Sequence, residues 1–137
     1  MTTKPEAEHA ETFLSVLVPI DIAVQRIADL MIGAIEGGST QWCLRIEHRF
    51  PPGTRFSEKP WYASPEIYDR EDFSLNVHVD DEDEPLHVIT KNSLMGGFTT
   101  MARKYGNHFR DFMEEGEDAV TADVWFQCVV LGDVVYR

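Results

Sequence analysis

Three histidines are the first candidates for chemistry, because imidazole nitrogens are common zinc ligands. His48, His78 and His87 each lie in a segment with strand character. A hairpin turn centred on residues 82–83 would set His78 directly opposite His87, and a neighbouring strand would bring His48 to the same face. The alternative is that the three are separate, partly exposed strand residues. Because no H-x-H, H-E-x-x-H or nearby cysteine accompanies them, the sequence favours the alternative and predicts no metal site.

The remaining residues give little evidence for a site of nucleophilic catalysis. Cys43 and Cys128 are the only cysteines, and both lie in apolar stretches, which predicts reduced thiols in the core. No G-x-S-x-G motif is present. The acidic residues form runs, which are typical of solvated surfaces rather than of paired catalytic carboxylates. The sequence therefore predicts a protein that is not an enzyme and that holds no cofactor.

Two glycine pairs decide between a phosphate-binding loop and ordinary helix geometry. A phosphate loop runs from a strand through glycines into a helix N-terminus, where amide groups face the anion. Around Gly37 and Gly38 the order is reversed, because an apolar-periodic segment over 20–36 precedes them and a strand-like segment follows. We therefore expect Gly37 to end a helix in the left-handed conformation. Gly96 and Gly97 lie inside a second predicted helix, where we expect them to admit the close approach of another backbone.

Basic and aromatic residues gather between positions 45 and 70, where five of the chain's 12 basic residues lie. Arginine beside aromatic rings binds a nucleobase and its phosphate, and it also anchors protein interfaces. A third interpretation is a long loop that its own aromatic rings hold against the core. We expect residues 51–71 to be ordered, with Trp61 or Tyr62 packed on the domain. The candidate binding residues here are Arg49, Arg55, Trp61 and Tyr62.

The net charge of the chain is −12, from 24 acidic and 12 basic residues. Such a field repels polyanions and disfavours binding to nucleic acid. One interpretation of this acidity is that it aids solubility. The other is that an acidic surface imitates a phosphate backbone and occupies a protein that binds nucleic acid. The runs 80–84 and 114–118 would form that surface, and the candidate residues are Asp80, Asp81, Glu82, Asp83 and Glu84.

Periodicity and turn residues predict a flexible tail over 1–10 and a single α+β domain over 11–137. A small, mainly antiparallel sheet should pack against three to four helices. Strands are predicted over 12–18, 41–50, 73–79 and 86–90. Helices are predicted over 20–36, from a cap at Asn92 or Ser93 to Gly106, over 108–115 and over 119–131.

The last of these helices leaves a choice open. Its β-branched residues favour a strand, whereas a cap at Asp118 or Thr121 and a stop at Gly132 favour a helix, which we adopt. No apolar run approaches the length of a membrane span, and the N-terminal residues do not resemble a signal peptide, which predicts a cytoplasmic protein. In the strand over 41–50, alternation predicts a core-facing set that comprises Trp42, Leu44, Ile46 and His48.

Two segments resemble the motifs of a protein family. "EGGSTQWC", from Glu36 to Cys43, matches an E-G-G…W motif, and "TADVWFQCVVLGDVVY", from Thr121 to Tyr136, matches a T-A-D…Q…G-[DE]…Y motif. On these motifs the chain resembles, nearly end to end, a family of small uncharacterised proteins encoded by bacteriophages and prophages. The resemblance implies expression in the cytoplasm of a bacterial host. It implies no catalytic residue, because no activity is established for the family.

These observations predict a small acidic binding protein of phage or prophage origin. We expect it to inhibit a host system, such as a defence system, by occupying a host protein, with nucleic-acid mimicry as one route. One alternative is a nucleotide-binding module that sequesters a small signalling nucleotide through the 45–70 segment. A second alternative is a component of the virion or of its assembly. Nucleic acid and membrane are not expected partners, and the oligomeric state, including a homodimer, stays open.

Overall fold

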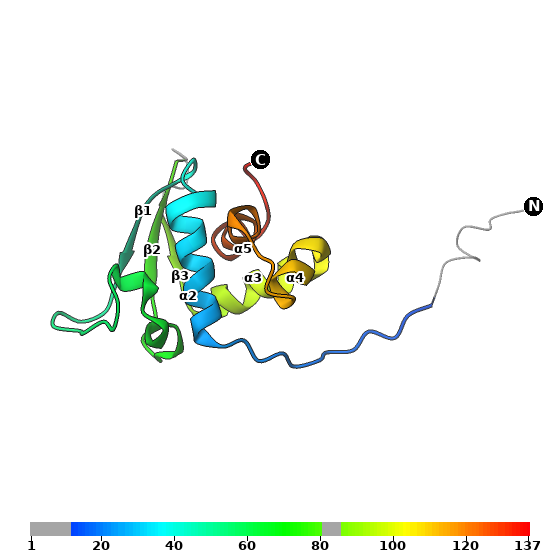
Figure 1. Ribbon diagram of the computed structural model, residues 1–137, viewed down its shortest axis with the longest axis horizontal. Helices are drawn as coiled ribbons and strands as arrows, with labels where there is room; N and C mark the ends of the chain where they lie inside the picture. The colour runs from blue at the N-terminus through cyan, green and yellow to red at the C-terminus, as the bar shows by residue number, and fades with distance from the viewer. Residues whose placement is uncertain (1–11, 81–85) are drawn as a thin grey trace, which may run out of the picture.

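The computed structural model of the chain describes residues 12–80 and 86–137, and it confirms the predicted α+β fold. A three-stranded antiparallel sheet forms one side of the domain, and the helices form the other (Figure 1). The elements are α2 (Val24–Gly33), η1 (Ala34–Gly38), β1 (Cys43–His48), η2 (Trp61–Ala63), η3 (Pro65–Asp69), β2 (Leu75–Val79), β3 (Leu86–Ile89), α3 (Lys91–Lys104), α4 (Gly106–Met113) and α5 (Ala119–Leu131).

The sheet has the order β1-β2-β3, and a bulge in β1 changes one predicted face. Cys43 pairs with Val79, but Arg45 pairs with the adjacent His78, so one extra residue is inserted in β1. That residue, Leu44, is 65% exposed instead of facing the core. Alternation over 41–50 therefore predicted Leu44 wrongly, because a bulge shifts the side-chain pattern by one position. Trp42 is buried, as predicted.

The register of the β2–β3 hairpin separates two of the histidines. Val77 pairs with His87, and His78 pairs with Leu86. Paired residues share one face of an antiparallel sheet, so His78 and His87 lie on opposite faces. The arrangement in which three histidines converge on one face is therefore wrong. Within residues 12–80 and 86–137, no group of three or more His, Cys, Asp or Glu side chains is placed to hold a metal ion.

Helix α5 forms the centre of the domain and contacts α2, α3, α4 and β3. The Asp118 side chain accepts a hydrogen bond from the Thr121 amide at 2.9 Å, and Gly132 closes the helix with a φ of 83°. These two ends confirm the predicted helix over 119–131. Because neighbouring elements surround α5, its buried residues occupy all of its faces, which explains the absence of an amphipathic pattern. Across the two described ranges, no helix combines the length and apolarity that spanning a bilayer requires.

The glycines after α2 end the helical segment, but not by the predicted geometry. Gly37 and Gly38 belong to η1, a π-helical turn that Ser39 closes by donating its amide to the Ala34 carbonyl at 2.8 Å. Neither glycine has a positive φ, so the left-handed conformation expected at Gly37 is wrong. A Cβ on Gly38 would overlap the carbonyl oxygen of Ala119 in α5. Close packing of two helical segments, rather than chain reversal, therefore requires glycine at position 38.

Helix α3 begins and ends slightly differently from the prediction. Thr90, rather than Asn92 or Ser93, is the N-cap, and the Ser93 hydroxyl accepts the Thr90 amide at 3.0 Å in a capping box. Gly106 is the first residue of α4 instead of the last residue of α3. Gly97 lies against α5, because a Cβ there would overlap Val129, and this confirms the expected close approach at that position. The same expectation is wrong for Gly96, where a Cβ would meet nothing within 4 Å.

The N-terminal segment from 12 to 22 is an extended arm rather than the predicted strand over 12–18. Within residues 12–80 and 86–137, none of its backbone groups takes part in a backbone hydrogen bond. Leu14 and Leu17 are both 93% exposed. The arm leaves α2 and extends away from the domain, as the blue trace in Figure 1 shows. A strand is defined by its pairing, and no described segment of this chain pairs with the arm.

Candidate functional site

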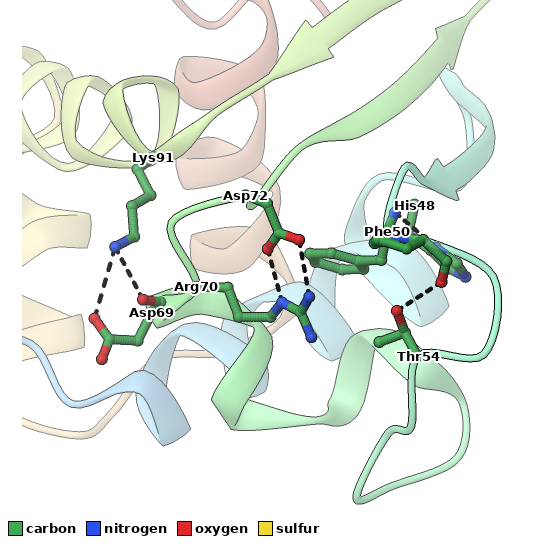
Figure 2. Close-up of polar contacts among 8 residues, drawn as sticks. His48, Phe50, Thr54, Asp69, Arg70, Asp72 and Lys91 are labelled. Atoms are coloured by element: carbon green, nitrogen blue, oxygen red, sulfur yellow. Dashed lines mark hydrogen bonds and ion pairs between the residues drawn. The ribbon is translucent and has the colours of Figure 1, made fainter.

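The loop after β1 is held by a cluster of rings around His48. Its imidazole centroid lies 5.0 Å from the ring of Phe56, 5.1 Å from that of Trp61 and 5.5 Å from that of Phe50. Thr54 closes the turn at the start of the loop by donating its hydroxyl to the Pro51 carbonyl at 2.6 Å (Figure 2). These contacts confirm an ordered loop and assign His48 to packing rather than to metal binding.

Charged residues stabilise the C-terminal end of the same loop. The Arg70 guanidinium lies 4.7 Å above the ring of Phe50 and donates to both carboxylate oxygens of Asp72, at 2.7 and 2.8 Å (Figure 2). This ion pair lowers the pKa of Asp72. Lys91 at the start of α3 donates to the Asp69 carbonyl at 3.0 Å. Arg70 is therefore occupied within the fold and is not free to bind a partner.

Trp61 and Tyr62 also stabilise the loop itself. Trp61 is partly buried and packs against the core. The Tyr62 hydroxyl donates to the Glu36 carboxylate at 2.7 Å, and the Tyr62 carbonyl accepts the Tyr68 hydroxyl at 2.5 Å. Burial and then the Glu36 carboxylate raise the pKa of Tyr62 to about 12. The expectation that Trp61 or Tyr62 packs on the domain is confirmed.

Arg49 and Arg55 differ from Arg70, because both are exposed. Within the described ranges, their side chains and that of Lys59 make no salt bridge and no hydrogen bond. Free cations are unexpected in a chain with twice as many acidic as basic residues. We call these three residues, with Trp61 and Tyr62, the loop platform. It is a braced loop whose three basic side chains form no salt bridge with any described residue.

The acidic candidates are only partly described. Asp80 is exposed at the end of β2, where its amide donates to the Trp42 carbonyl at 2.9 Å. The other four candidates of that run, over 81–84, lie outside the described residues. In the run over 114–118, Glu117 pairs with Arg26 at 3.0 Å and Asp118 caps α5. Two acids of the second run therefore stabilise the fold and do not form a free acidic surface.

The residues of the two family-like motifs meet around Asp123 of α5. Its Oδ1 accepts hydrogen bonds from the Ser39 hydroxyl and from the Trp42 indole N–H, both at 2.7 Å. Its Oδ2 accepts from the Gln127 amide at 2.8 Å. Both oxygens are engaged, and the two donors to Oδ1 come from a distant segment, so Asp123 ties the turn after α2 to α5. This carboxylate is a structural acceptor rather than a free catalytic base.

Gln127 is fully buried and fixes the C-terminal tail. Its Oε1 accepts the amides of Val135 and Tyr136, and its Nε2 donates to the Tyr136 carbonyl, all at 2.8 Å. The Tyr136 ring stacks on Trp42, with centroids 5.8 Å apart. Sequence reasoning missed this network, although Asp123 and Gln127 were visible as polar residues one helical turn apart in an otherwise apolar helix.

The two thiols are poor nucleophiles. Burial raises the pKa of Cys43 to about 11, and burial, with a smaller effect of the Asp133 carboxylate, raises that of Cys128 to about 11. Both cysteines are free, and both therefore remain protonated near neutral pH. Neither thiol supplies the thiolate that covalent catalysis requires.

No protein-family model, no curated protein and no solved structure gives a significant match.

Proposed function

We propose that the protein is a non-enzymatic binding protein of phage or prophage origin that inhibits a bacterial host system by occupying one of its proteins. The loop platform is the surface that carries this proposal. Its aromatic rings are already packed, so the loop loses little conformational freedom on binding. Its free cations, Arg49 and Arg55, are the residue type that is enriched at the centres of protein interfaces.

The charge of the platform indicates the kind of partner surface that it fits. Arg55 and Arg49 have no acidic partner within the described ranges, so a carboxylate-rich surface on another protein would satisfy them. The rest of the chain is strongly acidic, which repels nucleic acid and favours a protein partner. Imitation of a phosphate backbone would use the acidic run over 80–84, of which Asp80 is described and exposed.

A small signalling nucleotide is the second candidate ligand, since arginine and aromatic rings also bind nucleobases. Here, however, the rings of Phe50, Phe56 and Trp61 pack on His48 and on one another. Base stacking needs an open aromatic face. The packing of the loop therefore favours a protein partner over a nucleotide.

Affinity capture from a bacterial lysate tests the proposal, with Arg55→Ala and Arg110→Ala as a matched pair. Both arginines are exposed, and each variant removes one positive charge. We expect wild type and Arg110→Ala to retain a host protein and Arg55→Ala to bind it at least roughly tenfold more weakly, about 1.4 kcal/mol. Equal capture by both variants would show that the interface lies outside the loop. Recovery of a nucleotide or of virion particles instead of a host protein would support the alternatives.

A further inference from the structure

The N-terminal arm exposes six large apolar side chains to solvent. The amides and carbonyls of the arm have no backbone partner among the described residues. An unpaired, apolar, β-branched segment is a template for strand pairing. The exposed apolar residues of the arm are Phe13, Leu14, Val16, Leu17, Val18 and Ile20.

An apolar groove lies beside the root of the arm. It has a volume of about 370 Å³, and its walls are the arm residues 16–22 on one side and side chains of α3 and α4 on the other. Met95 on α3 is 60% exposed there, beside Phe98 and Phe109. Its only charged lining residue is Arg103, although the chain carries 24 acidic residues. A second negatively charged copy of the chain would therefore meet no carboxylate in this groove.

We propose that two copies of this chain exchange their arms. Residues 12–18 of the two copies pair as antiparallel strands about a twofold axis, and each arm fills the groove along α3 of the other copy. Pro19 has no amide hydrogen, so it ends the paired segment before α2 begins. Pairing satisfies the backbone groups of the arm, and the groove covers its apolar side chains. The proposal is independent of the loop platform, which lies on a different segment of the chain.

The area and the geometry favour a second copy as the occupant. At roughly 100 Å² for each of the six exposed apolar side chains, the two arms alone would bury about 1,200 Å². The surfaces that receive them add to this area, so the total meets the about 1,200–2,000 Å² that stable complexes bury. Residues 16–22 already form one wall of the groove in their own chain, so the space between that wall and α3 is open to the arm of another copy. Each copy supplies one arm and one groove, so the exchange is closed and self-complementary.

Light scattering and sedimentation of the full chain over a dilution series test the proposal. We expect wild type to have the mass of two chains and to dissociate on dilution. Leu17→Glu in the arm and Met95→Glu in the groove should each weaken the dimer at least roughly tenfold. Leu44→Glu is the matched control, because Leu44 is a similarly exposed leucine on the sheet, and this variant should remain dimeric.

Amide exchange of the wild-type protein gives a measurement that needs no variant. We expect the amides over 13–18 to be protected in the dimer and to lose protection on dilution. A wild-type monomer, with or without a protected arm, would overturn the proposal, and so would a dimer that Leu17→Glu leaves intact. Protection of the arm that appears only with a host protein would assign the groove to that protein and would also overturn it.

Discussion

The two adjacent glycines in α3 provide a sharp test of how the helices pack. A Cβ on Gly97 would overlap Val129 Cγ2 in α5 and would lie 3.1 Å from the Val129 Cα and N atoms. A Cβ on Gly96 would meet nothing within 4 Å. The same substitution, one residue apart in the same helix, therefore changes helix propensity equally at both positions but changes packing at only one.

The expected free energies of unfolding follow from these contacts. Gly96→Ala should stabilise the protein by about 0.5–1 kcal/mol, which is the helix-propensity difference. Gly97→Ala should destabilise it by about 1–3 kcal/mol, because rotation of Val129 relieves only the side-chain overlap and leaves the backbone contacts. The difference of roughly 2–4 kcal/mol corresponds to a separation in Tm of about 6–15 °C for a domain of this size.

Urea and thermal unfolding, followed by circular dichroism at one fixed protein concentration, measure this difference. Val129→Ala in the background of Gly97→Ala removes the overlapping methyl group and should restore part of the lost stability relative to the sum of the two single variants. Equal unfolding midpoints for Gly96→Ala and Gly97→Ala would refute the close approach of α3 and α5.

Three further predictions concern helix packing, the buried network and pH. Gly38→Ala should lower the free energy of unfolding by about 1–3 kcal/mol, because its Cβ meets a backbone oxygen. Gly37→Ala makes only an ordinary 3.4 Å contact and should stay within about 0.5 kcal/mol of wild type. Equal losses of stability in urea unfolding would contradict this. Asp123→Asn turns an acceptor into a donor that faces other donors, so we expect a loss of about 1–3 kcal/mol and faster amide exchange in the C-terminal tail; an unchanged tail would argue against the network. The hydrogen bond from Lys104 lowers the pKa of Asp133 from 3.8 to about 2, so its stabilisation is present above the unfolded pKa and is lost as pH falls through about 2; a carboxyl titration by NMR near the ordinary pKa would disprove it.

The sequence predicted the elements whose signals are local. Asp118 and Gly132 mark the two ends of α5, and those ends outweighed the strand preference of its β-branched residues. The strand predicted over 12–18 failed for a different reason. β-Propensity describes a side chain that fits a sheet, but a strand also needs a neighbour, and no sequence pattern supplies one. The bulge at Leu44 similarly depends on pairing with β2.

For the candidate site, too, the sequence predicted local features but not the partners that the fold supplies. Clustered aromatic residues correctly indicated a loop that packs on itself, because burial of large rings is a property of composition. The sequence did not show that Arg70 is paired while Arg55 is free, since the partner depends on the fold. It also missed the network of Asp123 and Gln127. The donors to Oδ1 of Asp123 lie more than 80 residues away in the sequence, and the donors to Oε1 of Gln127 lie in the C-terminal tail.

Arm exchange and the loop platform together predict how the protein binds. A dimer joined through its arms carries two loop platforms, so it would bind a partner with two equivalent sites at both of them. Avidity of this kind strengthens binding by roughly 10²–10⁴-fold when the geometry allows it. Leu17→Glu should then weaken capture of an oligomeric partner while it leaves the affinity of a single site unchanged. Arg55→Ala should weaken both. Biosensor measurements with the partner at high and at low surface density separate the two effects, and equal losses for Leu17→Glu at both densities would contradict the link between them.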